Sequence, residues 1–289
     1  MASSNPSTDL QNLFGVEGLV VVITGGGSGL GAMMAGALEN NGATVYILGR
    51  RKESLEKTIA ERARHGRMYA IQADVTDRDT LKAAAAHVRE KHDHIDLLVN
   101  NSGVMTGDIS AGHSHGGDIR KLQDALWDGH SPEDFAKMFE VNVTGAYWST
   151  VAFLDLLAAA NNGKDLSATM SQVITVSSIA GFRRDGKIGS IGYCLSKSAA
   201  THLGRLLVGT LKDFKIRSNI IAPGLFPSEM TVDKMDPVFI REGIALQRTG
   251  TEEDMTGLIL YLAGRSGAYV DGTTFAPDGG RISTIPSFF

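Results

Sequence analysis

Short apolar runs recur along the chain, and longer helical patterns separate them. The runs are LVVVIT (19–24), TVYIL (44–48), RMYAIQAD (67–74), IDLLVNN (95–101), SQVITVSS (171–178), IRSNIIAP (216–223) and the short TTFAPDGG (273–280). Strands that are apolar on both faces are typical of a parallel sheet covered by helices on both sides. Because crossovers between parallel strands are right-handed, the pattern predicts an α/β fold with one Rossmann-type doubly wound sheet of about seven strands.

The domain organisation follows from the same pattern. The 289 residues suffice for one large α/β domain, and neither a linker nor an internal repeat interrupts the alternation. We expect residues 16–289 to form this single domain. The preceding residues, 1–15, have neither the basic nor the apolar region of a secretory signal, so we interpret them as an N-terminal arm that is mobile or docked.

Charge and cysteine content argue against several classes of partner. A net charge of −4 gives no electrostatic reason to expect nucleic acid or an anionic membrane as partner. The most apolar late run, VAFLDLLAAA (151–160), is short and contains Asp155, so we expect no membrane span. The single cysteine, Cys194, excludes an intramolecular disulfide and suits a reducing compartment, and we expect a cytoplasmic protein.

A glycine-rich turn, TGGGSGLG (24–31), lies between the first predicted strand and a helix. Glycines let a phosphate approach main-chain N–H groups, and the helix N-terminus adds partial positive charge. The alternative is a plain glycine-rich turn, but the strand–turn–helix context favours nucleotide binding. The candidate cofactor-binding residues here are Gly25, Ser28, Gly29, Leu30 and Gly31.

The end of the second predicted strand bears on the choice of dinucleotide. An acidic residue about 20 residues past the glycines would bind the adenosine ribose and favour NAD. The chain has Arg50 and Arg51 there instead. An arginine can form a bidentate contact with a 2′-phosphate, so we predict NADP(H), with two solvated arginines as the alternative.

Residues 104–130 break the strand–helix rhythm as an insertion rich in Gly, His, Asp and Ser. Connections of this length in compact domains are usually functional or disordered. His113 and His115 lie within it, but two loop histidines without further ligands do not predict a metal site, and we expect none. Beyond the insertion, Tyr193 and Lys197 are four residues apart on a predicted helix, a spacing that places them on one face and is common on helix surfaces.

Several motifs stand together in a specific order. They are TGGGSGLG, Asp74-Val75, NNSG (100–103), Asn142 in EVNVTG, VSSIAG (176–181), YCLSK (193–197) and PGLFPSEMT (223–231). In this order, over residues 16 to 281, the chain resembles the short-chain dehydrogenase/reductase family. In style it is similar to fungal members and, more loosely, to reductases of the rhamnolipid 3-oxoacyl type.

The resemblance implies catalytic roles for four residues. Tyr193 would be the general acid in carbonyl reduction, and Lys197 would lower the pKa of Tyr193 and bind the nicotinamide ribose. Ser178 would bind the substrate oxygen; the position of Gly181 selects it over Ser177, although both serines could simply complete the turn. Asn142 would hold a water on a proton path to Lys197.

The resemblance also implies further cofactor contacts. Tyr193 and Lys197 would contribute to the cofactor site as well as to catalysis. Asp74 and the Val75 backbone would contact the adenine. The remaining positions line the adenosine side or the nicotinamide pocket: Asn101, Gly103, Pro223, Gly224, Phe226 and Ser228.

A substrate lid is expected at about residues 225–250, where Met230, Met235, Phe239 and Ile240 either cover a hydrophobic substrate or simply pack. The implied activity is NADP(H)-dependent interconversion of a ketone and a secondary alcohol, on a hydrophobic, polyketide- or lipid-like metabolite. Two alternatives stay open: a lyase, isomerase or cyclase on the same fold, and a dinucleotide sensor. The resemblance implies a homodimer or homotetramer.

Overall fold

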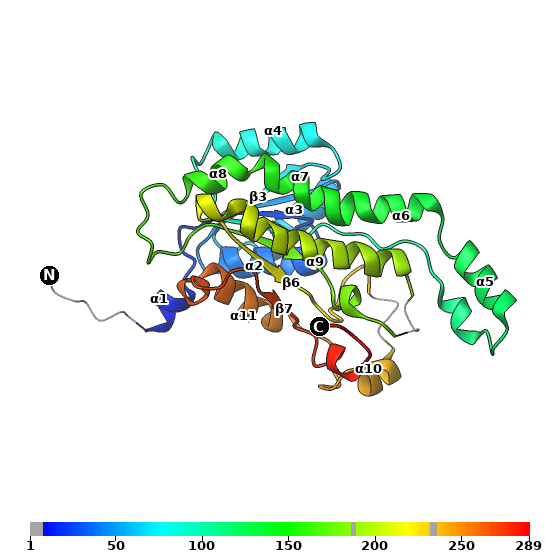
Figure 1. The fold of residues 1–289 in the computed structure, drawn as a ribbon. Helices are drawn as coiled ribbons and strands as arrows, with labels where there is room; N and C mark the ends of the chain where they lie inside the picture. The colour runs from blue at the N-terminus through cyan, green and yellow to red at the C-terminus, as the bar shows by residue number, and fades with distance from the viewer. Residues whose placement is uncertain (1–7, 186–188, 232–235) are drawn as a thin grey trace.

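The computed structural model describes residues 8–185, 189–231 and 236–289. Its centre is a parallel sheet of seven strands in the order β3-β2-β1-β4-β5-β6-β7 (Figure 1). The strands are β1 (Val20–Thr24), β2 (Thr44–Gly49), β3 (Met68–Gln72), β4 (Leu97–Asn100), β5 (Gln172–Val176), β6 (Arg217–Ile221) and β7 (Thr274–Phe275). Each predicted run contains one of these strands, and the sheet confirms the predicted Rossmann-type α/β class.

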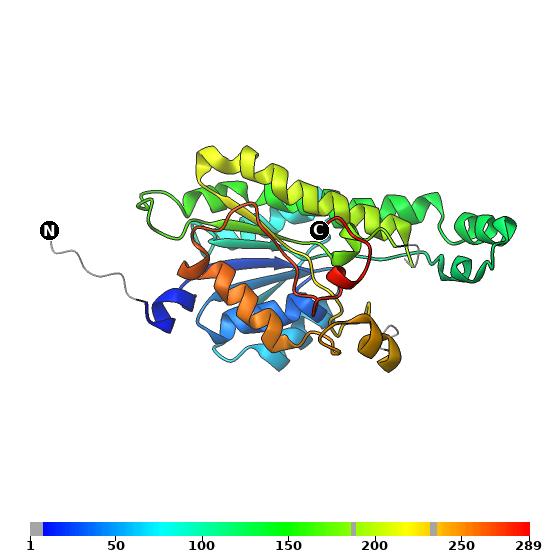
Figure 2. The same ribbon diagram turned by 60° about the horizontal axis from the view of Figure 1, so that its bottom comes forward.

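Helices cover both faces of the sheet, as Figure 2 shows. One face carries α2 (Gly29–Asn40), α3 (Lys52–Arg62) and α11 (Glu252–Ala263). The other carries α4 (Arg78–Arg89), α7 (Gly145–Ala152), α8 (Leu154–Ala159) and α9 (Ile191–Leu211). Alternate residues of one strand serve the two cores: Val21 packs toward α2, while Val20 and Val22 pack toward α8. This two-sided burial is the physical reason for the unbroken apolar runs.

The helical segment that follows Ser131 is interrupted twice. It begins with α6 (Pro132–Phe139), which Ser131 caps by accepting a hydrogen bond from the Asp134 N–H group. A π-helical turn, η2 (Glu140–Thr144), separates α6 from α7, and Phe153 separates α7 from α8. Such π turns often mark functional positions, and η2 contains Asn142.

The insertion at 104–130 has secondary structure that the sequence pattern did not predict. It contains a short 3₁₀ helix, η1 (Ser110–Ser114), and α5 (Ile119–Asp128). Figures 1 and 2 both show α5 standing out from the body of the molecule. Leu122 and Ala125 of α5 face Gly112 of η1, while Ile119 and Trp127 are exposed.

Both ends of the described part of the chain pack against the sheet and its helices. In the N-terminal arm, α1 (Leu10–Phe14) contacts α11 and the 3₁₀ turn η6 (Arg265–Gly267). At the other end, Phe288 and Phe289 pack against Phe182. Between β6 and α11 lies α10 (Pro237–Gly243), and η7 (Ile282–Thr284) follows β7; the remaining short turns are η3 (Ile179–Phe182) and η4 (Lys212–Phe214). Among the described residues, no helix is both long enough and apolar enough to cross a membrane.

Candidate functional site

A cleft of about 500 Å³ runs along the carboxyl ends of the strands. Its walls come from the segments that directly follow β1 through β6, because parallel strands bring their carboxyl ends to one edge. The structure brings almost every predicted site residue to this cleft. The lining includes Gly25, Ser28, Gly29, Leu30, Arg50, Arg51, Asp74, Val75, Asn101, Gly103, Ser178, Tyr193, Lys197, Pro223, Gly224, Phe226 and Ser228. Gly31 and Asn142 are the predicted residues outside this lining.

The glycine turn requires residues without a side chain at two positions. Gly25 and Gly29 adopt positive φ angles of 67° and 51°, a region that favours glycine. Asn101 braces the turn, since its Nδ2 donates to the carbonyl oxygens of Thr24 and Gly25 at 3.0 Å each. Ser28 is the N-cap of α2 but makes no side-chain capping bond. The first N–H groups of α2 therefore face the cleft as a cradle that could hold a phosphate.

Gly31 lies outside the lining of the cleft, and its expected role as a cofactor contact stays a prediction. A Cβ atom there would lie 2.3 Å from the Gly25 carbonyl oxygen and 2.5 Å from Asn101 Nδ2. The absent side chain lets α2 pack directly against the glycine turn. The spacing of the glycines alone does not distinguish a packing glycine from one that faces a ligand.

Two arginines stand at the end of β2, both exposed and both on the cleft wall. Arg51 donates to Glu229 Oε2 at 2.8 Å, so an ion pair bridges the cleft from β2 to the segment after β6. Sequence reasoning missed Glu229, which lies 178 positions away from Arg51. No acidic residue occupies the end of β2 itself, where the chain reads Leu48-Gly49-Arg50-Arg51.

Asp74, after β3, lies on the cleft wall as a carboxylate. Burial acts to raise its pKa, but hydrogen bonds from Thr76 and the charge of Arg50 outweigh burial and lower the pKa. The two Thr76 contacts, from N–H and Oγ1, go to Asp74 Oδ1 at 2.9 and 2.8 Å.

Tyr193, Ser178 and Lys197 meet at the end of β5. Tyr193 and Lys197 share one face of α9, and the Lys197 Nζ atom is 5.9 Å from the centre of the Tyr193 ring. Ser178 lies on the same cleft wall as Tyr193, and its side chain acts to lower the pKa of the Tyr193 hydroxyl. Lys197 is 3% exposed and donates to the Val176 carbonyl oxygen at 2.9 Å. This arrangement can bind a carbonyl oxygen between two hydroxyls with an ammonium nearby.

The structure separates the two candidate serines. Ser177 Oγ is buried and occupied, since it donates to the Lys197 carbonyl oxygen and contacts Thr201 Oγ1, each at 2.7 Å. Ser178 is half-buried on the cleft wall beside Tyr193. Of the two serines, Ser178 has the geometry for contact with a substrate.

The expected effect of Lys197 on Tyr193 is wrong for this structure. Burial raises the pKa of Tyr193 to about 12, although the Ser178 hydrogen bond acts to lower it. Burial likewise lowers the pKa of Lys197 to about 8. Each group loses hydration on burial, and this loss is the largest cause of both pKa shifts. The charge of Lys197 lies 5.9 Å from the centre of the Tyr193 ring, too far to outweigh the burial of the tyrosine. Tyr193 is therefore a protonated acid at neutral pH.

Asn142 is 2% exposed and supports the site from behind. Its Oδ1 accepts from the Val104 N–H group at 2.8 Å, while its Nδ2 donates to the Val104 carbonyl and to Ser196 Oγ at 2.9 Å each. These bonds tie the π-helical turn to the segment after β4 and to α9. Its role on a proton path stays a prediction.

The segment after β6 closes the nicotinamide side of the predicted site. A Cβ on Gly224 would lie 2.7 Å from Asp278 Cα, so only glycine lets these two segments approach. Ser228 Oγ lies 2.9 Å from Thr231 Oγ1, and Thr231 Oγ1 donates to the Phe226 carbonyl oxygen at 2.5 Å. Met235 of the predicted lid falls outside the described residues. Within the described ranges, no group of three or more His, Cys, Asp or Glu side chains could hold a metal ion.

Sequence reasoning also missed Ser190, the N-cap of α9. Its Oγ accepts from the Tyr193 N–H group at 3.2 Å. The available signal was a serine directly before an apolar helical segment, which is a common N-cap pattern.

Comparison with known proteins points to one family. A sequence model described as short chain dehydrogenase matches residues 19–237. The short-chain dehydrogenase/reductase PhomF of Diaporthe leptostromiformis is 41% identical over 295 residues, covering 100% of this chain and 99% of the relative. The rhamnolipids biosynthesis 3-oxoacyl-(acyl-carrier-protein) reductase of Pseudomonas aeruginosa is 30% identical over 271 residues, covering 92% of this chain and 97% of the relative.

A solved structure gives the same result. The Pseudomonas aeruginosa RhlG/NADP active-site complex superposes with a TM-score of 0.81 at 30% identity, over 94% of this chain and 99% of that chain.

Proposed function

The chain belongs to the short-chain dehydrogenase family, and from this premise we propose that it is an NADP(H)-dependent oxidoreductase. It interconverts a ketone and a secondary alcohol, with Ser178, Tyr193 and Lys197 as catalytic residues. The observation that carries this proposal is that Tyr193, Ser178 and the buried Lys197 line one cleft that extends to the glycine turn, with Lys197 Nζ 5.9 Å from the centre of the Tyr193 ring. A dinucleotide sensor would not need a tyrosine acid in this position.

The residues present fit a dinucleotide. Cβ atoms at Gly25 and Gly103 would approach Asn101 Nδ2 to 2.9 Å and Lys197 Nζ to 3.2 Å, so glycine keeps the cleft open at both points. The cradle of α2 would hold the pyrophosphate, Asp74 the adenine, and Lys197 the nicotinamide ribose. When bound, the nicotinamide supplies the hydride.

The side chains would supply orientation and the proton. Ser178 Oγ donates to the substrate carbonyl oxygen and holds it beside Tyr193 Oη. Tyr193 then gives its proton to that oxygen as negative charge develops there. Lys197, with Nζ 5.9 Å from the centre of the Tyr193 ring, would place a positive charge near the forming tyrosinate.

Two features support NADP(H) over NAD(H). The end of β2 has two arginines and no acid, so a 2′-phosphate would meet positive charge there. The related structure from Pseudomonas aeruginosa is described as a complex with NADP. The Arg51–Glu229 pair removes part of that positive charge, which leaves Arg50 as the stronger candidate for the 2′-phosphate contact.

We extend the proposal to a hydrophobic carbonyl substrate, such as a polyketide- or lipid-like metabolite. Apolar side chains that line the cleft include Val104, Phe226 and Met230, of which Met230 is 37% exposed. One relative is named for the reduction of 3-oxoacyl groups. Apolar side chains on a cleft rim favour an apolar ligand over a sugar.

The test is turnover of a panel of aromatic and long-chain ketones with NADPH, followed by the loss of absorbance of the reduced cofactor. We expect turnover of at least one ketone, and we expect Tyr193→Phe to lower kcat by about 10²–10⁴-fold while NADPH still binds. Product formation without consumption of NADPH would instead point to the lyase, isomerase or cyclase alternative. Absence of turnover on the whole panel would contradict the proposed substrate class.

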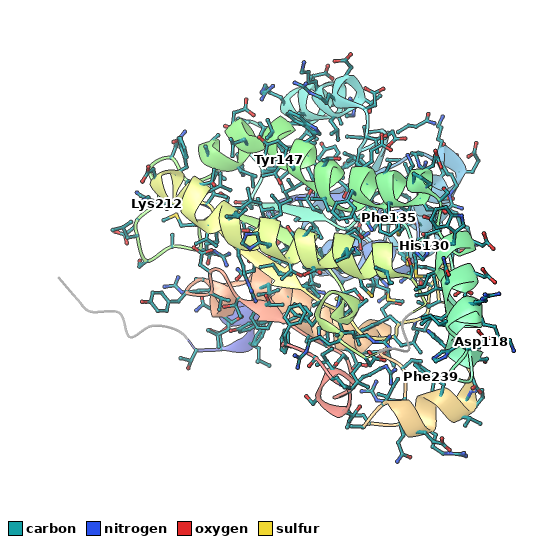
Figure 3. The ribbon with its side chains drawn as sticks, turned by 45° about the vertical axis from the view of Figure 1, so that its right-hand side comes forward. Asp118, His130, Phe135, Tyr147, Lys212 and Phe239 are labelled. Atoms are coloured by element: carbon teal, nitrogen blue, oxygen red, sulfur yellow. The ribbon has the colours of Figure 1, made fainter. Side chains whose placement is uncertain are left out.

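We also propose a homodimer or homotetramer that uses the outer faces of α7 and α9. Tyr147 and Val151 of α7 and Leu195 and Leu206 of α9 are exposed apolar side chains (Tyr147 is labelled in Figure 3). A contiguous apolar face of this kind is typical of an interface. Light scattering on the wild type and on Leu206→Glu is the test: a dimer or tetramer that the charge disrupts supports the proposal, and a monomeric wild type contradicts it.

A further inference from the structure

One hydroxyl joins the insertion to the helix that carries Tyr193. Ser190, 4% exposed, is the N-cap of α9 and lies three positions before Tyr193. Its Oγ accepts from the Tyr193 N–H group at 3.2 Å, donates to the Thr106 carbonyl oxygen at 3.1 Å, and lies 2.8 Å from His130 Nε2. Thr106 and His130 stand at the two ends of the insertion.

The Ser190 hydroxyl has one proton and two lone pairs for these contacts. One lone pair accepts from the Tyr193 N–H group. Two nearby acceptors can take the proton: the Thr106 carbonyl oxygen at 3.1 Å, with His130 Nε2–H then donating to Ser190, or an unprotonated His130 Nε2 at 2.8 Å. The tautomer of His130 sets the direction, but in both cases removal of the imidazole takes a hydrogen-bond partner from a buried hydroxyl.

The base of the insertion is closed around this junction. The Asp108 N–H group donates to the Gly129 carbonyl at 2.8 Å, and the Ile109 N–H group donates to the Gly189 carbonyl at 2.9 Å. The His130 ring lies 5.3 Å from the Phe135 ring of α6, and Figure 3 shows both side chains near the start of α9. Two contacts therefore position the imidazole of His130: its ring packs against Phe135, and its Nε2 is hydrogen-bonded to Ser190.

Contact between α6 and α9 makes this region sensitive to small shifts. A Cβ on Gly192 would lie 2.4 Å from Met138 Cε and 3.3 Å from Phe135, so the start of α9 packs closely on α6. If the His130 contact is lost, α9 cannot shift toward α6 to compensate, because the two helices are already in close contact at Gly192. The alternative is that the first turn of α9 loosens, and Tyr193 lies in that turn.

We propose that His130 is a positioning residue for the reaction, acting through Ser190 on the first turn of α9 and so on the place of the Tyr193 hydroxyl. This inference rests on the proposed function for its kinetic consequence only. It assigns a role in catalysis to the base of the insertion, where Thr106 and His130 contact Ser190.

The variants separate the hydrogen bond from packing. His130→Phe keeps a ring against Phe135 and removes the hydrogen bond to Ser190, and His130→Gln restores an amide that can donate or accept near the same place. We expect His130→Phe to lower kcat about tenfold, where kcat is calculated from the concentration of sites that bind NADPH. The KM for ketone and the Kd for NADPH should change less than about twofold. We expect His130→Gln to recover most of kcat. Trp127→Ala, exposed on α5, is the matched control and should leave kcat unchanged.

A double-mutant cycle tests the pathway through Ser190. Ser190→Ala should lower kcat at least as much as His130→Phe, and the double variant should be no worse than Ser190→Ala within about twofold, since both changes break the same link. Independent, multiplying losses would overturn the proposal. Unchanged kcat in His130→Phe, or equal losses in His130→Phe and His130→Gln, would also overturn it.

Hydrogen exchange keeps this test apart from the proposed function. If the wild type reduces no ketone, the proposed function fails, but exchange of the Tyr193 amide still reports on the junction. His130→Phe should speed that exchange, and His130→Gln and Trp127→Ala should leave it at the wild-type rate. Equal exchange in wild type and His130→Phe would overturn the positioning role whatever the activity.

Discussion

The substitution Gly31→Ala tests whether the glycine turn is held in place by packing from behind. The new Cβ would lie 2.3 Å from the Gly25 carbonyl oxygen, 2.5 Å from Asn101 Nδ2 and 2.9 Å from the Gly25 carbonyl carbon. Because ordinary contacts begin about 1 Å farther out, the turn, the amide of Asn101 or the start of α2 must move by a similar amount.

The size of the effect follows from that displacement. Overpacking of a closely packed site costs about 1–3 kcal/mol, so we expect Gly31→Ala to lower the free energy of unfolding by about 2 kcal/mol. In a domain of this size that corresponds to roughly 3 °C in Tm. A cradle moved by about 1 Å also weakens its contacts with a phosphate, and we expect NADPH affinity to fall about tenfold.

Thermal unfolding and fluorescence titration with NADPH measure the two effects on the same samples. Gly257→Ala is the matched control: Gly257 is in the middle of α11, and a Cβ there has open space around it. That change should raise stability by about 0.5–1 kcal/mol and leave NADPH affinity unchanged. If Gly31→Ala has the Tm and the affinity of wild type, the packing argument is refuted.

Three further changes probe the cleft and its support. Burial lowers the pKa of Lys197 to about 8, so its charge is present below that pH and lost above it. The kcat/KM for NADPH-dependent reduction should therefore fall as the pH rises above about 8. A flat profile up to about pH 9.5 would contradict this. Glu229→Gln breaks the ion pair with Arg51 and removes a negative charge from the cleft, so NADPH should bind about threefold more tightly in a fluorescence titration. Glu56→Gln, which removes an exposed charge on α3, is the control and should leave NADPH affinity unchanged. Phe182 is 3% exposed and packs against Phe288 and Phe289. Phe182→Ala should therefore lower the free energy of unfolding, measured by urea denaturation, by about 3–4 kcal/mol. A loss below about 1 kcal/mol would mean that these contacts do not stabilise η3, the turn that follows Ser178.

Much of the fold could be predicted because its determinants are local. Each strand is a continuous apolar run, and the two cores on either side of the sheet explain why Val20, Val21 and Val22 are all apolar. The same reasoning could not find η2 or the break at Phe153, since no proline marks either place and Gly145, directly after η2, has helical backbone angles. The helix α5 was missed because a segment rich in glycine, histidine and serine was interpreted as a loop.

The site shows the same division between local and distant determinants. The cradle, Arg50, Ser178, Tyr193 and Lys197 lie in short motifs at strand ends, where parallel topology brings them together. The contact of Arg51 with Glu229 joins residues far apart in the sequence, as does that of His130 with Ser190, and no motif marks either pair. The pKa of Tyr193 also depends on burial, which spacing on a helix does not reveal.

The central claim, that this cleft binds NADP(H) through the arginines at the end of β2, has a direct measurement. It is a paired fluorescence titration of NADPH and NADH on the wild type and on Arg50→Ala. We predict that NADPH binds wild type at least about tenfold more tightly than NADH and that Arg50→Ala removes most of this preference, since a charge-assisted contact of an arginine is worth about 1.5–3 kcal/mol. Equal affinity for the two dinucleotides, or a preference that survives the mutation, would contradict the account.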